Sequence, residues 1–346
     1  MDPAFTPCLP FKAFVHSTSS LNAAQKPSHL CYPALRRKQH VKRHSGHASV
    51  PVMRHSGTEV PVADSSEELP LSSESLGTSY GFLNSELVSA IEGEWFGFEG
   101  TFGPDGKALP IPDRYVPDEF REWGVAPSGF DVVTSSRLKE GVLYVKRTRA
   151  LPSVGCEADA VVPEVSISTY EGEGNVGFSD GCVSCGPVEF GNAPSFTILT
   201  RGKQRVRLGF KVDAAIGNVT IILEKWGQEF CDGQVLPGCG GGDRFVEEAS
   251  SHVEDLLGAW DFDAEDVDIC NQSGIQESSG SLNREKIEGH ILLLPRGLSV
   301  RLVEEGKSVL VESGWLCENT RTVVARLYEE GNLVKVSKRF ERRGAD

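Results

Sequence analysis

The sequence predicts a mainly β protein whose antiparallel strands form a barrel or a sandwich, arranged as two tandem β units that each follow a short helix. Short segments rich in β-branched and aromatic residues recur along the chain, bounded by Gly, Pro, Asn or Asp. Only two segments have a helical spacing of apolar residues, and landmarks of the first half recur in the second. Many short strands with turns between them are typical of sandwiches and up-and-down barrels.

Composition bounds the class of protein and its partners. The chain has 346 residues, of which 39% are hydrophobic and 24% charged, as in ordinary globular proteins. A net charge of −14 argues against nucleic acid as the main partner, because phosphate neutralisation needs a basic surface. No stretch approaches the roughly 18 apolar residues that span a bilayer, so we expect no transmembrane segment.

Residues 1–58 are predicted to be a transit peptide. They hold eight Lys or Arg but a single acid, Asp2, and many serines. They lack the apolar core of about 7–15 residues that marks a secretory signal. The absence of an opening Arg-rich amphipathic helix favours the chloroplast over the mitochondrion. The alternative is a disordered basic tail.

Residues 59–83 are predicted to be a disordered acidic linker, because five acids and several Ser and Pro stand there without a basic residue. Folding is expected to begin with a first unit over residues 84–230. Asn84 or Ser85 can cap a short helix that carries Leu87 and Ile91 on one side and ends at Gly93.

The remainder of the first unit reads as strands, followed by a Gly-rich linker over residues 231–243. In the first of these strands, Leu143 and Val145 are interpreted as one face and Lys146 and Arg147 as the other. The expected strands are Leu143–Arg149, Val165–Tyr170, Ser195–Thr200, Gln204–Val212 and Asn218–Lys225.

A second, smaller unit is expected over residues 244–346. A helix is predicted over Arg244–Leu257, with Gly258 as its C-cap. The acidic run that follows Trp260 is interpreted as a solvated loop rather than a calcium site, because the Gly and terminal Glu of an EF-hand are missing. The expected strands are Gly289–Leu294, Leu298–Val303, Ser308–Leu316, Thr322–Tyr328 and Leu333–Glu341.

The two units repeat the same landmarks. Each opens with a Trp just after its helix, Trp95 and Trp260. Arg207 lies ten residues before Gly217-Asn218, and Arg321 lies ten residues before Gly331-Asn332. Both Gly-Asn pairs are predicted to form tight turns before a last alternating strand.

Several motifs carry a resemblance to a known family. Gly93-Glu94-Trp95 has the form in which calycin barrels begin, and the segment Phe178–Pro187 with Arg205-Val206-Arg207 extends the match. This order resembles a plastid and cyanobacterial family of calycin-like proteins of unknown function. Further motifs, at Leu294–Gly297 and Glu312–Leu316, also resemble the related S/T-type phycobilin lyases. The resemblance covers about residues 86–343 and implies lipocalin-like antiparallel barrels.

The resemblance implies a barrel face that binds a hydrophobic small molecule, a tetrapyrrole above all. Arginine forks can hold the propionates of such a ligand. Because side chains alternate along a strand, Arg205 and Arg207 lie on one face and Val206 on the other. If Val206 faces an apolar interior, both arginines are in solvent. The tryptophans can line a ligand pocket or close the hydrophobic core. The implied ligand residues are Trp95, Arg205, Arg207, Glu224, Trp315, Arg321, Arg326 and Tyr328.

Cysteines are a second possible source of chemistry. Cys182 and Cys185 have the spacing of a metal knuckle or a redox pair, and Cys231 with Cys239 could complete a zinc site. The second pair is too widely spaced for typical zinc, and the first sits in a Gly-rich turn rather than at a helix start. Simple buried thiols are therefore favoured, with a regulatory disulfide as a remaining alternative.

Other enzyme signatures are missing. Outside the leader the chain has two histidines, His252 and His290, far apart, and Gly238–Gly242 lacks the Lys and Ser or Thr of a phosphate loop. The sequence thus favours a non-catalytic plastid protein that binds a tetrapyrrole, with a photosynthetic assembly protein as a possible partner. A bilin lyase and a ligand-free assembly scaffold are the alternatives.

Overall fold

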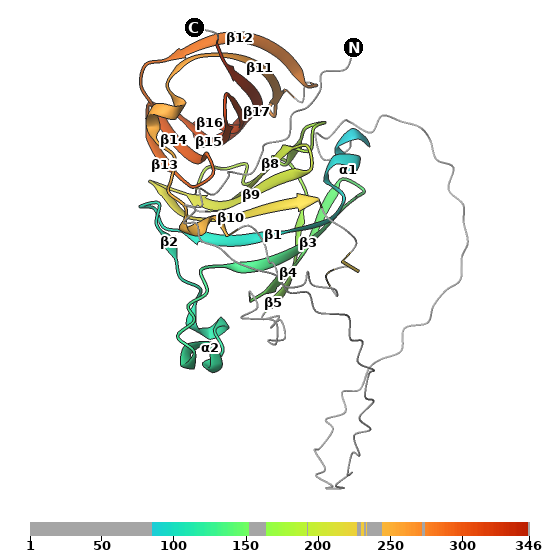
Figure 1. The fold of residues 1–346 in the computed structure, drawn as a ribbon. Helices are drawn as coiled ribbons and strands as arrows, with labels where there is room; N and C mark the ends of the chain where they lie inside the picture. The colour runs from blue at the N-terminus through green and yellow to red at the C-terminus, as the bar shows by residue number, and fades with distance from the viewer. Residues whose placement is uncertain are drawn as a thin grey trace, which may run out of the picture. The chain divides into compact units, whose positions relative to one another are not determined.

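The structure, a computed structural model, describes residues 85–151, 164–191, 193–226, 230–231, 233, 244–271 and 274–344. The predicted transit peptide, the acidic linker and Asn84 lie outside these ranges, as does most of the Gly-rich linker. Within them the chain is mainly β, as predicted, and forms antiparallel sheets with little helix (Figure 1).

The first sheet has ten strands in the described part of the chain and carries two short helices. Its order is β5-β4-β3-β1-β10-β9-β8-β7-β6, with β2 paired to β1. The helical segments are α1 (Ser85–Ile91), η1 (Asp113–Tyr115) and α2 (Asp118–Glu122). The strands are β1 (Gly93–Phe102), β2 (Ala108–Leu109), β3 (Phe130–Lys139), β4 (Val142–Ala150), β5 (Glu164–Tyr170), β6 (Val176–Gly177), β7 (Val183–Cys185), β8 (Pro194–Arg201), β9 (Gln204–Val212) and β10 (Ile216–Trp226).

The second sheet has seven strands among the described residues and curls strongly in Figure 1, where it is drawn in orange and red. Its order is β12-β11-β17-β16-β15-β14-β13. Two 3₁₀ turns, η2 (Phe245–Glu247) and η3 (Val253–Leu256), precede it. The strands are β11 (Gly258–Asp268), β12 (Gln276–Arg284), β13 (His290–Leu293), β14 (Leu298–Glu305), β15 (Ser308–Cys317), β16 (Thr320–Glu329) and β17 (Asn332–Arg343).

Both sheets place their first long strand between the second long strand and the last one. In the first sheet β1 pairs with β3 on one side and with β10 on the other. In the second, β11 pairs with β12 and with β17. This closure of the last strand onto the first brings side chains from the start and the end of each sheet to one face.

One hydrophobic cluster joins the two sheets. Phe98, Leu208 and Ile221 of the first sheet belong to the same buried cluster as Val300 and Val324 of the second. Burial of these apolar side chains contributes roughly 1.5–3 kcal/mol each relative to exposure. The opposite face of the first sheet is covered at one end by α1, which buries Leu87 and Ile91 against strands β4 and β7. Each sheet therefore has one face in the shared core.

The ten strands expected from the sequence are confirmed, with ends that differ by a few residues, and the first helix is confirmed as α1. Four long strands were not expected: β1, β3, β11 and β12. The sequence of β1 contains three glycines, and a Cβ at Gly97 would lie 2.0 Å from the carbonyl oxygen of Leu223. Close contact between strands explains this glycine better than a turn does.

The predicted helix over Arg244–Leu257 is wrong. Its residues form η2 and η3 with an extended segment between them, because tertiary contacts override the helical spacing. Ser250 pairs with Pro295, and the amide of Ser251 donates to the carbonyl of Leu294, 3.3 Å away. Phe245 is inserted between Phe98 and Phe102 of the core.

Two further expectations are corrected at the loops. The Gly217-Asn218 pair lies inside β10 beside a register shift, not in a turn. In the second sheet the turn is Glu330-Gly331, whose φ values of 51° and 85° fit a two-residue hairpin, and Asn332 begins β17. The acidic run after Trp260 is strand β11, not a loop, with several of its acids directed at basic residues of β17.

None of the described helices is long and apolar enough to cross a membrane.

Candidate functional site

The inner face of the first sheet, defined as the face that carries Trp95 and Arg205, gathers charged side chains from five strands. On β9 and β10 Arg205 lies directly opposite Glu224. The Nε of Arg205 donates to Oε2 of Glu224 at 2.6 Å, and neither side chain has exposed surface. Across the face, the same guanidinium donates to the hydroxyl of Ser136 and to the carbonyl of Ile91 at the end of α1. Arg205 is thus fully engaged within the protein.

Trp95 closes this end of the face. Its ring lies 4.0 Å from the guanidinium carbon of Arg205, within the range of a cation–π interaction. The edge of a second ring, Trp226, packs against it at 5.0 Å between centroids. Burial lowers the pKa of Arg205 to about 10, an effect that Glu224 opposes and Arg207 reinforces. The same two arginines hold the pKa of Glu224 below its ordinary value, even though burial pushes it upward.

Of Arg205 and Arg207, Arg207 is the one that keeps an unused hydrogen-bond donor. Its Nη1 donates to the hydroxyl of Thr134 at 2.9 Å and lies 3.5 Å from Glu224 Oε1. Its Nε is buried and has no hydrogen-bond partner. The guanidinium carbon lies 5.1 Å from the ring of Phe196, on which Tyr170 stacks at 4.8 Å. A donor without an acceptor therefore stands beside two stacked rings.

A second group of charges adjoins Arg207 on the same face. Glu99 of β1 accepts from Arg149 Nη2 at 2.6 Å and from Arg147 Nη1 at 3.3 Å. Arg149 also donates to Glu164 at 2.5 Å. Burial lowers the pKa of Arg147, with Arg149 and Arg207 acting in the same direction and Glu99 against it. Arg147 and Arg207 therefore act on each other as like charges.

The inner face carries a net positive charge although the whole chain is acidic. The carboxylates of Glu99, Glu164 and Glu224 face four guanidiniums, so one positive charge is left over. Such an excess in a partly buried region favours an anionic group. The arrangement can hold a carboxylate beside aromatic rings.

The sequence suggested that Arg205 and Arg207 are in solvent if Val206 faces an apolar interior, and the structure corrects this expectation. Val206 is fully buried in the core between the sheets, yet Arg205 and Arg207 are buried as well. Strand β9 is covered on both faces, which a simple alternation argument does not consider. Arg147 likewise shares the face of Val145 instead of opposing it.

Three of the sequence-predicted ligand residues lie where the two sheets meet. Trp315 is part of the shared core, with Arg201 over its ring. Arg326 donates to the carbonyls of Gly174 and Pro187 and to the hydroxyl of Ser184, all in the first sheet's half of the chain. Tyr328 donates to the same Pro187 carbonyl at 3.1 Å. Arg326 and Tyr328 thus tie the second sheet to the first.

Arg321, the remaining predicted residue, lies on the second sheet, away from the inner face of the first. It donates to Glu312 at 2.7 Å and faces Glu341 on the neighbouring strand. The structure therefore brings together Trp95, Arg205, Arg207 and Glu224, and separates them from the other four predicted residues.

Cys182 and Cys185 are buried free thiols. Val183–Cys185 forms strand β7, so the second cysteine is in a strand and not in a turn. Burial raises the pKa of Cys182 to about 12, with Asp180 adding to the effect, and burial also raises the pKa of Cys185. Of the possible zinc partners, Cys231 is exposed and Cys239 lies outside the described residues. In the described ranges, no three His, Cys, Asp or Glu side chains converge as metal ligands would.

Sequence reasoning missed several members of the inner face: Thr134, Tyr170, Phe196 and the pair Glu99 and Arg149. Glu99 and Arg149 lie 50 residues apart in the chain and meet only because β3 lies between β1 and β4. The available signal was the spacing of Arg147 and Arg149, which repeats that of Arg205 and Arg207 and points to a second inward pair.

Comparison with known proteins adds a likeness of fold. No family model matches the chain, and no curated protein does. Among solved structures, the chain is similar to a protein of unknown function of the DUF3598 family from Nostoc punctiforme. Its TM-score is 0.50 at 18% identity, and the match covers 75% of this chain and 98% of the other. The likeness is one of fold alone. It is consistent with the cyanobacterial resemblance of the sequence motifs and carries no activity.

Proposed function

We propose that this chain is a non-catalytic binding protein that holds a carboxylate-bearing apolar small molecule, a tetrapyrrole, on the inner face of its first sheet. The observation that supports the proposal is the buried, unpartnered Nε of Arg207 beside the stacked rings of Phe196 and Tyr170. A propionate can accept from this donor, and the half-buried ring of Tyr170, which stacks on the buried Phe196, can offer a flat apolar surface to a macrocycle.

The contacts on this face distinguish residues that can bind the ligand from residues that hold the face in shape. Arg205 pairs with Oε2 of Glu224 without exposed surface, whereas Oε1 of Glu224 has no hydrogen-bond partner and lies 3.5 Å from Arg207 Nη1. We assign Arg205 and Glu224 to holding the face in shape. Arg147, whose side chain is 23% exposed and lies near Arg207, is the second candidate for a carboxylate. Tyr170 and Phe196 supply the apolar wall. Trp95 supports Arg205 from behind and has a positioning role.

We further propose that each sheet is a calycin-like unit and that the two are tandem repeats. In each, the residue two places after the opening Trp lies opposite a buried Glu of the last strand: Gly97 opposite Glu224, and Phe262 opposite Glu341. Each Glu in turn lies opposite an arginine of the preceding strand. This shared register is the support for a repeat. The relation to the S/T-type phycobilin lyases belongs to the same proposal.

The acid-poor basic leader places the protein in the chloroplast under this proposal. A photosynthetic assembly protein is the partner we expect there. The lyase alternative requires transfer of a bilin to a cysteine of a second protein, and the scaffold alternative requires that no tetrapyrrole binds.

Absorbance titration separates these three functions. The full chain is titrated with haem, protoporphyrin IX and biliverdin, and the shift of each absorption band is followed. A saturable shift with one of them supports the binding function, whereas the absence of any shift supports the scaffold. Transfer of biliverdin to an added phycobiliprotein subunit, seen as covalent colour after denaturing electrophoresis, would support the lyase.

A further inference from the structure

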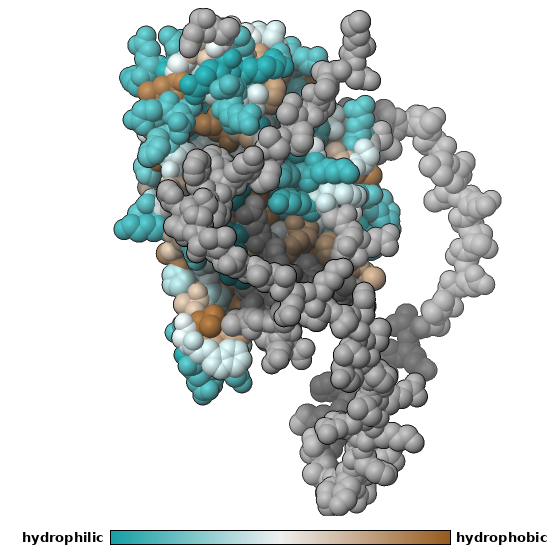
Figure 2. All heavy atoms as spheres, viewed as in Figure 1, coloured by the Kyte–Doolittle hydropathy of each residue, from teal (hydrophilic) through white to brown (hydrophobic). Residues whose placement is uncertain are grey.

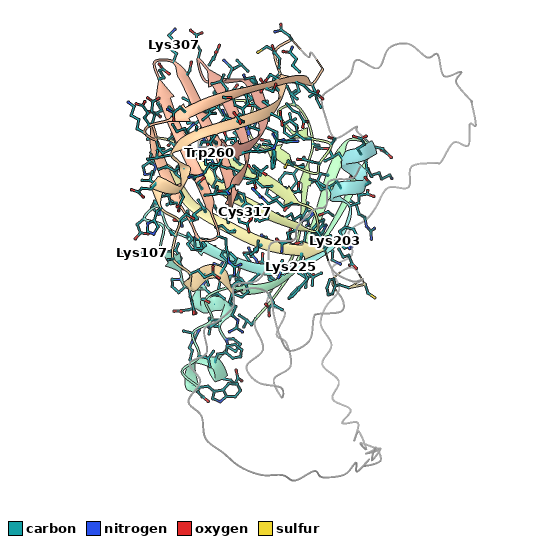
Figure 3. All side chains as sticks on the ribbon, turned by 45° about the horizontal axis from the view of Figure 1, so that its top comes forward. Lys107, Lys203, Lys225, Trp260, Lys307 and Cys317 are labelled. Carbon is teal, nitrogen blue, oxygen red and sulfur yellow. The ribbon has the colours of Figure 1, made fainter. Side chains whose placement is uncertain are left out.

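The second sheet carries a face with a large excess of arginine, which the proposed function does not use. This arginine face is turned away from the shared core and surrounds Trp260, which Figure 3 labels. It is made of strands β11, β12, β14, β15, β16 and β17. Its charged members around Trp260 are Arg284, Arg301, Arg321, Arg339, Arg343, Glu312 and Glu341. Further along the same face lie Asp268 and the ion pair of Asp266 with Lys335.

One carboxylate, Glu312, holds three of these arginines. Its Oε1 accepts from Arg321 Nη2 at 2.7 Å. Its Oε2 accepts from Arg339 Nη2 at 2.8 Å and from Arg301 Nη2 at 3.1 Å. A carboxylate has one negative charge, so Glu312 offsets one of the three guanidinium charges, and Arg321 and Arg339 also lie 3.4 and 3.7 Å from Glu341.

Glu341 supplies the second carboxylate and is similarly shared. It accepts two bonds from Arg284, at 3.0 and 2.5 Å, and a weaker one from Arg321 at 3.4 Å. Arg343 stacks over Trp260 and donates to a backbone carbonyl at Asp255. Five guanidiniums thus face two carboxylates, in a chain whose total charge is −14.

Three of the arginines keep a buried donor without a hydrogen-bond partner. These donors are the Nε atoms of Arg301, Arg321 and Arg339. A buried donor that is left unpaired lowers the stability of the folded state, because it has lost its hydrogen bond to water. These three donors therefore destabilise the folded protein on its own, and a bound acceptor would supply the missing hydrogen bonds.

A cavity opens at one end of the arginine face. It has a volume of about 590 Å³ and is lined by Arg284, Arg301, Lys286 and Asn283 together with Glu285 and Glu288. If Lys286, which pairs with Glu288, and the two glutamates are counted with the charged members around Trp260, this region still has two positive charges in excess. In Figure 2 the visible surface over the second sheet is mostly hydrophilic.

We propose that the arginine face is a second binding site, for a small multivalent oxyanion such as a phosphate ester or a dicarboxylate. Guanidinium forks bind the adjacent oxygens of both groups. The ligand enters through the cavity, where Arg284 and Arg301 meet it, and its charge offsets the excess around Glu312. The site is separate from the inner face of the first sheet, so it stands independently of the tetrapyrrole proposal.

Calorimetric titration of the full chain with pyrophosphate and with succinate at low ionic strength tests this site. Wild-type protein should bind at least one of them at a single site. Arg301→Gln and Arg339→Gln should each weaken that binding about tenfold or more, the fold-change expected for the loss of one charge-assisted hydrogen bond. Pyrophosphate binding identifies a phosphate ligand, and succinate binding a dicarboxylate.

Arg342→Gln is the matched control, because Arg342 is on the same strand but pairs with Asp263 on the opposite face and is 53% exposed. It should change affinity by less than about twofold. Melting curves recorded without anion show whether each variant is folded. If Arg301→Gln does not fold, Arg339→Gln is the variant that tests the site, because the side chain of Arg339 is 26% exposed and its replacement disturbs the core less. Binding of neither anion by wild type, or equal losses in Arg342→Gln, would overturn the site. Arg207→Met should leave these titrations unchanged.

Discussion

Arg205 and Glu224 face each other across β9 and β10 with 2.6 Å between Nε and Oε2, and neither has exposed surface. The pair is repeated on the second sheet by Arg321 and Glu341, which face each other across β16 and β17 at 3.4 Å. In both places the two last strands of a sheet are joined by a buried ion pair. Arg205 itself lies over the opening Trp95 of the first sheet, whereas Arg284 and Arg343 lie over the opening Trp260 of the second.

The Arg205–Glu224 pair should be costly to break from one side. Glu224→Gln leaves the guanidinium buried without a counter-charge, and we expect it to lower the free energy of unfolding by about 3–5 kcal/mol. The double variant Arg205→Met with Glu224→Leu should recover much of that loss. Urea unfolding followed by far-UV circular dichroism measures both. Glu330→Gln, which breaks an exposed pair with Lys307, is the control and should cost less than about 1 kcal/mol. A loss for Glu224→Gln no larger than that of the control would contradict this role.

Glu312 should make the protein sensitive to acid. Burial raises its pKa, but Arg321, Arg301 and Arg339 outweigh burial and hold the folded pKa far below the ordinary value of 4.5. A carboxyl with a depressed folded pKa stabilises the folded state above pH 4.5, and this contribution is lost as the pH falls toward the folded value. We therefore expect the free energy of unfolding to decrease steadily between pH 5 and pH 3. Equal stability at pH 7 and pH 3 would be inconsistent with this electrostatic arrangement.

The two buried cysteines should be nearly inert toward alkylation. A pKa of about 12 leaves Cys182 with very little thiolate at pH 8, and its side chain is also out of reach of the reagent. Iodoacetamide labelling of the native protein, read by peptide mass spectrometry, should modify the exposed Cys270 at least about 100-fold faster than Cys182 or Cys185. Comparable rates would show that the β7 region opens readily and would revive a redox role.

Much of the fold could be predicted from the sequence where a strand has a clear local pattern. Strand Gln204–Val212 has β-branched and apolar residues between clear turn signals, and its bounds were predicted to the residue. The other nine predicted strands differ from the structure by a few residues at one or both ends. Strand β12 was missed because its sequence, with three serines and a glycine, carries no apolar alternation. The helix over Arg244–Leu257 was predicted because its spacing is helical, whereas pairing of Ser250 with Pro295 decides the conformation.

The candidate site could be predicted only in part from the sequence. Arg205, Arg207 and Glu224 were selected by motif, and they do lie together. The sequence does not indicate that β9 is buried on both faces. One face packs in the core between the two sheets, and the other is covered by the end of α1 and by strands β1 and β3 of the same sheet. Nor does the sequence show that Arg326 reaches Pro187, 139 residues earlier in the chain. Such contacts follow from the topology and not from any local pattern.

Import into chloroplasts is predicted from the leader alone. The full chain, expressed with its own N-terminus and a C-terminal fluorescent tag in plant cells, should enter plastids and lose roughly 45–60 residues. N-terminal sequencing of the recovered protein locates the cleavage. Full-length protein confined to the cytosol would remove the plastid from the proposal.

The central claim is that Arg207 receives the carboxylate of a tetrapyrrole. The most direct measurement is the affinity of the wild type, Arg207→Met and Arg137→Met for the tetrapyrrole that gives the largest absorbance shift. Arg137 is exposed on β3 and serves as the matched control. Because Arg207 is buried against Phe196, methionine is chosen to keep its volume, and near-UV circular dichroism reports intact packing. We predict that Arg207→Met weakens binding by about 1–3 kcal/mol while Arg137→Met does not change it. Equal affinity of all three proteins would contradict the account.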